Sequence, residues 1–119
     1  MVGGENSNTP QMKYIYIVVN SAFAGCCKVG KTTEDNFRHR LTCYQTSDPF
    51  RRYEYAYLAM MEDPEGAEVD VAVHFEELLT VPGCEWYKAK RTGDKEHRNL
   101  IRRIITRIES YPGFIRRII

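Results

Sequence analysis

Residues 25–32 read Gly-Cys-Cys-Lys-Val-Gly-Lys-Thr, a run whose glycines, lysine and threonine could bind phosphate. The spacing satisfies G-x-x-x-x-G-K-[ST], the loop in which backbone N–H groups and a lysine hold the β- and γ-phosphates of a nucleotide. Such a loop opens directly from a strand, yet residues 21–24 separate Gly25 from the apolar run before it. Its fold also needs about five parallel strands, for which 119 residues are few. Nucleotide binding is therefore the less favoured interpretation.

Part of this run also belongs to a set of five ordered segments. They are Tyr14–Asn20 (YIYIVVN), Lys28–Thr32 (KVGKT), Arg40-Leu41, Asp70–His74 and Glu85-Trp86-Tyr87. Together they resemble the GIY-YIG nuclease superfamily, in the branch common in phage, viral and fungal proteins whose second motif is K-[IV]-G-K-T. The resemblance covers about residues 13–88. It implies an endonuclease that hydrolyses phosphodiester bonds, with DNA as the expected substrate.

Three basic or phenolic residues receive catalytic roles from this resemblance. Tyr16, at the motif tyrosine, would accept or relay the proton of the attacking water. Its pKa would need a nearby cation to lower it, which Lys28 or Arg40 could provide; Lys28 could instead hold a phosphate. Arg40 would clamp the scissile phosphate with its planar guanidinium, because helical geometry places it at the edge of an apolar stripe.

Carboxylates supply the metal site that the resemblance implies. Asp70 would bind Mg²⁺ or Mn²⁺, hard ions that prefer oxygen ligands. His74, one helical turn later, would orient the metal or contact substrate, or else only pack. Glu85 is a possible additional acid or a cap, while Trp86 beside it is better explained by packing than by stacking on a base.

Three features depart from the family pattern. Lys28 stands where the superfamily has its second tyrosine, as is normal for this branch, and Asp70 stands where glutamate is usual. The loop before Arg40 is about two residues longer than in many members. The Lys28 and Asp70 departures sustain an alternative: a catalytically weak nucleic-acid-binding or interaction module of the same fold.

The positive charge is concentrated late in the chain. The formal net charge is +1, but Lys95–Ile119 carries seven Lys and Arg residues against two acidic ones. The candidate nucleic-acid-binding residues are Lys31, Arg98, Arg102, Arg103 and Arg107. They would bind backbone phosphates without sequence preference. Alternatively, the basic residues simply form the solvent-exposed face of a helix.

Three strands are expected to position these residues. Lys13–Asn20 is β-branched and aromatic, Cys26–Gly30 can pair back on it as a hairpin, and Arg51–Met61 alternates tyrosines before becoming apolar. Cys84–Lys88 is a short segment, strand or loop. The sequence thus predicts an α/β fold with a small, largely antiparallel three-stranded sheet.

Helices are expected on either side of that sheet. One begins at a Thr32 or Thr33 cap and ends near Ser47-Asp48-Pro49. Another follows Asp63-Pro64-Glu65 and closes at Pro82-Gly83, although alternating valines leave a strand open for this segment. A final basic helix carries an apolar stripe of five residues: Leu100, Ile101, Ile104, Ile105 and Ile108. That stripe would dock on the domain or be buried in a protein partner or a second copy.

Length and composition indicate one domain. Domains commonly run to about 100–150 residues, so residues 13–119 are expected to form a single unit behind a disordered leader, residues 1–12. Hydrophobic residues make up 43% of the chain and charged residues 28%, with no run long enough to span a bilayer.

Location and redox state follow from what the sequence lacks. It shows no signal peptide, so an intracellular protein, cytoplasmic or nuclear and without a membrane, is expected. Cys26, Cys27, Cys43 and Cys84 show neither a zinc-ligand spacing nor a secreted disulfide framework. Reduced, buried thiols are the expectation.

Overall fold

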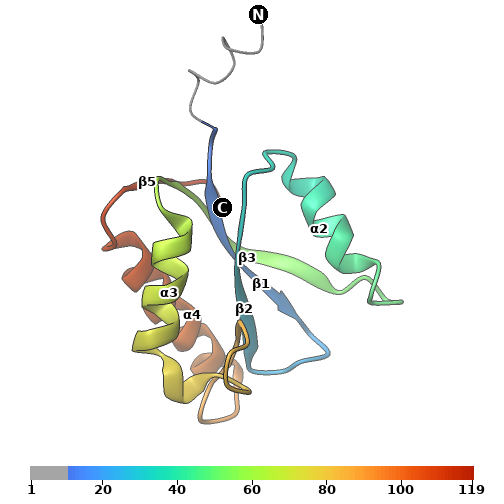
Figure 1. Ribbon diagram of the computed structural model, residues 1–119. Helices are drawn as coiled ribbons and strands as arrows, with labels where there is room; N and C mark the ends of the chain where they lie inside the picture. The colour runs from blue at the N-terminus through green and yellow to red at the C-terminus, as the bar shows by residue number, and fades with distance from the viewer. Residues whose placement is uncertain (1–10) are drawn as a thin grey trace, which may run out of the picture.

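Strand β1 (Tyr14–Asn20) lies at the centre of a five-stranded antiparallel sheet with the order β4-β2-β1-β3-β5. A computed structural model describes residues 11–119, so most of the predicted leader lies outside the described residues (Figure 1). The chain runs β1, β2 (Cys26–Thr32), α2 (Phe37–Gln45), β3 (Tyr53–Met61), α3 (Pro64–His74), a 3₁₀ turn η1 (Glu76–Leu78), β4 (Trp86–Lys88), α4 (Asp94–Glu109) and β5 (Phe114–Arg117).

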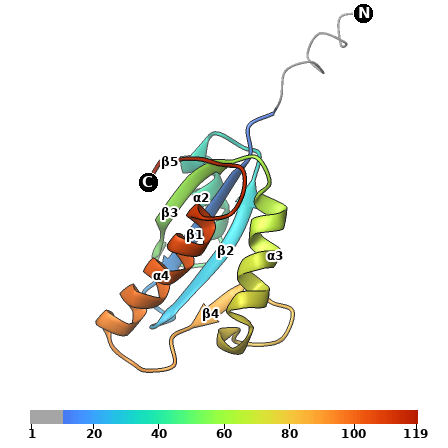
Figure 2. The same ribbon diagram turned by 90° about the vertical axis from the view of Figure 1, so that its left-hand side faces the viewer.

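The sheet separates two apolar cores, because successive strand residues point to opposite faces. Ile15, Ile17 and Val29 point to the face that α3 and α4 cover, and Tyr16 and Leu58 point to the face that α2 covers. Figure 2 shows α3 and α4 on one side of the sheet and α2 on the other. Residues of β1 that are neighbours in sequence therefore pack into different cores on opposite faces of the sheet.

The expected α/β class is confirmed, but the sheet is larger than three strands. Within residues 11–119, β4 pairs with β2, and β5 pairs with β3 at the opposite edge. The sequence left the first segment open and missed the second. A strand of four residues, of which only Phe114 is partly buried, carries little alternation that could reveal it.

The helix predictions are right in position and partly wrong at the ends. Helix α2 begins later than the predicted Thr32 or Thr33 cap, because Thr32 still belongs to β2. The observed cap is Asn36, whose side chain accepts a hydrogen bond from the His39 N–H group. Asp63 caps α3 as expected, by accepting from the Gly66 N–H group at 2.9 Å, which resolves the helix-or-strand choice. That helix ends at His74, well before Pro82, and η1 follows.

Helix α4 uses its apolar stripe to close the larger core. Leu100, Ile104 and Ile108 are buried, and Ile101 and Ile105 pack partly against the same cluster. The stripe is therefore docked on the domain itself. Among the described residues, no helix is both long and apolar enough to cross a membrane.

All four cysteines are free thiols in the described part of the chain, as expected. Their burial is only partly as predicted. Cys27 is buried, whereas Cys43 is exposed on α2 and the other two are half-buried.

Candidate active site at the edge of strand β2

Two tyrosine hydroxyls meet on the α2 face of the sheet. The hydroxyl of Tyr16 lies 2.7 Å from that of Tyr44, which projects from the last turn of α2. Arg40, one helical turn earlier, donates from Nη2 to the Tyr16 hydroxyl at 3.2 Å. Tyr44 was not among the site residues predicted from the sequence.

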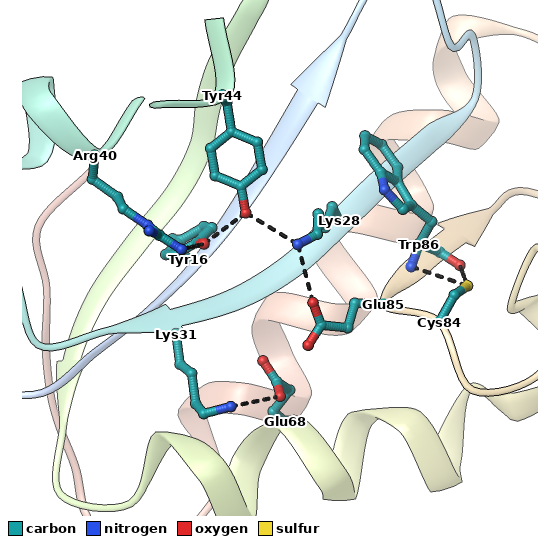
Figure 3. Close-up of polar contacts among 9 residues, drawn as sticks. All are labelled: Tyr16, Lys28, Lys31, Arg40, Tyr44, Glu68, Cys84, Glu85 and Trp86. Carbon is teal, nitrogen blue, oxygen red and sulfur yellow. Dashed lines mark hydrogen bonds and ion pairs between the residues drawn. The ribbon is translucent and has the colours of Figure 1, made fainter. Parts of the chain in front are cut away.

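Lys28 extends this cluster toward the sheet edge. Its Nζ donates to the Tyr44 hydroxyl at 3.1 Å and to Glu85 Oε1 at 3.0 Å. Glu85 reaches Lys28 because its residue directly precedes β4, whose Trp86 is the register partner of Lys28. Figure 3 shows the resulting line of contacts, from Arg40 through the two tyrosines and Lys28 to Glu85.

A second pair of charges lies across β2 from the tyrosines. Lys31 donates from Nζ to Glu68 Oε1 at 3.3 Å, while Glu68 Oε2 is buried without a hydrogen-bond partner among residues 11–119. In Figure 3 the Glu68 and Glu85 carboxylates point toward the same space beside β2. The site thus combines two cations and two hydroxyls on one side of the strand with carboxylates on the other.

Burial dominates the electrostatics of the Tyr16 phenol. Desolvation and the hydrogen bond to Tyr44 raise its pKa well above the ordinary value, and the contact with Arg40 only partly opposes this. Arg40 therefore lowers the pKa of this tyrosine, as expected of a neighbouring cation, but burial and Tyr44 outweigh it and the net shift is upward. Tyr16 stays protonated at neutral pH.

The charged neighbours are also shifted. Burial alone would lower the pKa of Lys28, but its hydrogen bonds to Tyr44 and Glu85 outweigh that effect and raise it, so the ammonium stays charged. Burial, followed by the negative charge of Glu85, raises the pKa of Glu68 despite the opposing Lys31. A carboxylate with a raised pKa and an unpartnered oxygen is one that a cation would stabilise.

Asp70, the predicted metal ligand, lies outside this cluster. Its two carboxylate oxygens accept from Arg107 Nε at 2.8 Å and Arg107 Nη2 at 3.0 Å, which ties α3 to α4. Residues two positions apart on a helix project about 200° apart. Because Glu68 faces β2, Asp70 must face away from it. The carboxylate that helix α3 brings to the site is therefore that of Glu68, not that of Asp70.

His74 is not brought to the site either. It is exposed at the end of α3, where its ring packs edge-on against Phe75 with centroids 4.8 Å apart.

The arginines of α4 lie on the far side of the sheet from the tyrosines. Arg107 is held by Asp70, Arg103 stacks over the Phe75 ring at 5.2 Å, and Arg102 donates to Asn99 at 3.3 Å. Arg98 is exposed on the same helix. They do not line the cluster around Tyr16, whereas Lys31 borders it.

The P-loop interpretation does not fit the structure. Residues 26–32 form β2, and Gly30 is the register partner of Tyr16 in an antiparallel hairpin. Backbone N–H groups engaged in a sheet cannot form the cradle around phosphates that the motif requires.

The fit of a divalent ion depends on Glu68. Within residues 11–119, no cluster of three or more His, Cys, Asp or Glu side chains is arranged to hold a metal. Mg²⁺, however, is often bound through one or two carboxylates while it keeps waters and substrate phosphates. The unpartnered Oε2 of Glu68, with Glu85 nearby, fits that mode of binding.

Comparisons with protein-family models, with curated proteins and with solved structures gave no match. The residues of the site are therefore the basis of the functional proposal.

Proposed function

We propose that this chain is a metal-dependent nuclease that hydrolyses phosphodiester bonds, with DNA as its substrate. One observation carries the proposal: the Tyr16 hydroxyl is held between Arg40 and Tyr44, and Lys28 joins the same contacts, beside a carboxylate with an unpartnered buried oxygen. Phosphodiester hydrolysis needs an oriented water, neutralisation of the phosphoryl oxygens and a path for a proton.

Arg40 and Lys28 supply the positive charge for a phosphate. Arg40 donates from Nη2 to Tyr16, while its Nε is buried and has no hydrogen-bond partner in the described part of the chain. That free donor favours a substrate oxygen as its missing acceptor, since buried N–H groups are rarely left unpaired. A phosphate bound there would lie between two fixed cations in a partly desolvated site.

The hydroxyls and a carboxylate share the handling of the attacking water. Because Tyr16 is protonated, its oxygen accepts a hydrogen bond from that water and orients it rather than removing its proton. Lys28 is a charged ammonium that donates to both Tyr44 and Glu85, so a proton does not pass through it. The carboxylate of Glu85, which faces the same space beside β2, takes the proton of the water.

Glu68, rather than Asp70, is the residue proposed to hold Mg²⁺ or Mn²⁺, with Glu85 close by. Such an ion, when bound, would neutralise charge on a phosphoryl oxygen and would lower the pKa of a bound water. This chain aims Glu68 at the site, and Lys31 favours its ionised form against the effect of burial.

The resemblance to GIY-YIG nucleases supports the same function. Tyr16, Lys28 and Arg40 are among the residues that carry the resemblance, and they are the ones linked here by hydrogen bonds through Tyr44. A relationship to that superfamily is part of the proposal.

A second candidate function is a non-cleaving nucleic-acid-binding module. The observation that favours it is the raised pKa of Tyr16, because a neutral phenol is a weak base. The cationic half of the site would serve either function.

Incubation of the protein with mixed single- and double-stranded DNA, with Mg²⁺ or with a chelator, tests the proposal. Cleavage should require the metal and should fall about 10²–10⁴-fold in Tyr16→Phe. Tyr57→Phe is the matched control, since that tyrosine of the same sheet donates to Glu109 on the opposite face. Binding without cleavage in any divalent metal would instead establish the binding module.

A further inference from the structure

A row of aromatic rings leads from the surface to the site. The Phe23 and Trp86 ring centroids are 5.6 Å apart, those of Trp86 and Tyr53 are 6.5 Å apart, and those of Tyr53 and Tyr44 are 5.3 Å apart. Tyr44 then contacts the Tyr16 hydroxyl. The aromatic row, defined as Phe23, Trp86 and Tyr53, is thus continuous with the candidate active site.

The outer part of the row is surface rather than core. Phe23 is 47% exposed on the β1–β2 turn, and Trp86 and Tyr53 are half-buried. Phe23 and Trp86 contribute to neither apolar core of the described chain. Packing was the role expected for Trp86 from the sequence, but its two ring neighbours in the row are themselves partly exposed.

Positive charge follows the same face. Lys28 is the register partner of Trp86, and Lys88, two residues after Trp86, projects from β4 to the same side and is exposed. Figure 3 shows the indole of Trp86 beside Lys28. A surface that binds single-stranded nucleic acid combines positive charges, which bind the phosphates, with aromatic rings, on which the bases stack. Ammonium groups next to aromatic rings provide this combination here.

We infer that the aromatic row binds unpaired nucleotides that flank the scissile phosphate, so that the substrate is single-stranded nucleic acid or a single-stranded region. This inference rests on the proposed function, of which it specifies the substrate class. Base faces in an intact duplex are covered by their stacked neighbours, whereas unpaired bases can stack on aromatic side chains. Phosphates that follow the row would then reach Lys28 and Arg40.

Trp86 is the only tryptophan in the chain, so its fluorescence reports on this row alone. A single-stranded oligodeoxynucleotide of about ten nucleotides is titrated into the full chain in a chelator, which prevents cleavage. Saturable quenching by the single strand, and weaker binding of the same strand annealed in a blunt duplex, is the expected result. Equal affinity for both with unchanged fluorescence would overturn the inference.

Substitutions then separate stacking from charge. Phe23→Ala, on an exposed turn, should weaken single-strand binding about 10-fold, the loss of one stacked base, and leave its salt dependence unchanged. Phe23→Tyr should retain binding. Phe50→Ala is the matched control, because Phe50 is 74% exposed but stacks only on Arg52 within the described chain.

The outcomes distinguish this inference from the proposed function. If Phe23→Ala binds and cleaves single strands as the wild type does, the row is packing and the nuclease proposal stands. If wild-type protein binds neither form of DNA, both fail. Cleavage confined to intact duplex would overturn the substrate class alone.

Discussion

Gly30 of β2 lies so close to the Tyr16 ring that a Cβ atom at position 30 would overlap the phenol carbon and the hydroxyl. The two residues are register partners in the β1–β2 hairpin. The absence of a side chain at position 30 is therefore what allows the Tyr16 hydroxyl to reach Arg40 and Tyr44.

Gly30→Ala should consequently displace the Tyr16 ring and break its contacts. We expect loss of cleavage and a destabilisation of about 1–3 kcal/mol, as is usual for overpacking. Chemical denaturation and the cleavage assay measure the two effects.

The control for Gly30→Ala is the double variant with Tyr16→Leu. If the overlap is the cause, the stability losses of the two single substitutions should not add. Additive losses, or an active Gly30→Ala protein, would show that position 30 does not constrain Tyr16.

Arg40→Ala should lower the rate of cleavage about 10²–10³-fold, because a donor to the phosphoryl oxygens is removed. Arg40→Lys should not restore it, since a lysine lacks the fork that contacts Tyr16 and a phosphate together. Arg38→Ala, on the exposed side of the same helix, is the matched control and should cleave as the wild type does. Equal losses in Arg38→Ala and Arg40→Ala would point to damage to α2 rather than to a specific role.

Glu68→Gln should remove the response to metal without loss of stability. Burial raises the pKa of Glu68, so the folded state holds this proton more tightly than the unfolded state does. The free energy of unfolding therefore falls as pH rises from the unfolded pKa to the raised folded one, and ionised Glu68 costs stability at neutral pH. Melting curves of Glu68→Gln should show an unchanged or higher midpoint and no stabilisation by Mg²⁺.

Asp70→Asn makes the complementary comparison. It should lower the melting midpoint slightly, because Arg107 loses its ionic partner, yet keep both the Mg²⁺ response and cleavage. If Asp70→Asn loses the Mg²⁺ response and Glu68→Gln retains it, the metal binds on the other side of α3.

Acid should weaken the fold through Asp48. Hydrogen bonds from Arg52, then from the N–H groups of Phe50 and Arg52 and from the Asn20 side chain, hold the pKa of this buried carboxylate far below its usual range. The stabilisation is complete above the unfolded pKa of about 3.9 and is lost as pH falls toward the folded pKa.

Asp48→Asn should therefore melt lower than wild type at pH 7, and its stability should change less between pH 5 and pH 2. Melting curves across that range, with exposed Asp35→Asn as control, measure the difference. An unchanged pH profile in Asp48→Asn would assign acid sensitivity to other carboxylates.

The resemblance named Tyr16, Lys28 and Arg40 as candidates, and local rules explain why the structure brings them together. Hairpin pairing and strand alternation place Tyr16 and Lys28 on one face of the sheet, and Arg40 reaches them from the edge of an apolar helical stripe. Tyr44 was hidden because one helical stripe both packs and carries a hydroxyl into the site.

The carboxylate of α3 could not be selected in the same way. Glu68 and Asp70 flank the buried stripe of Ala67 and Val71 on opposite sides, and either could face the strand. The choice depends on how α4 docks, because Arg107 takes Asp70 and leaves Glu68 to β2. Docking of two helices is a tertiary relation that periodicity does not encode.

The docked stripe of α4 also changes how its arginines can be tested. Removal of everything after Lys88 would uncover the larger core, so a truncated chain cannot report on phosphate contacts alone. Arg98→Ala with Arg102→Ala, both exposed, leaves the core intact.

The order of the elements has a consequence for synthesis on the ribosome. Every residue proposed to act lies between Tyr16 and Lys88, whereas Leu100, Ile104 and Ile108, which close the core on the α3–α4 side of the sheet, are translated afterwards. A nascent chain that has emerged only as far as β4 contains all the proposed reactive groups, but α4 does not yet cover the larger core. Cutting activity would thus first arise when α4 leaves the exit tunnel and docks, which separates the translation of the reactive groups from their activation.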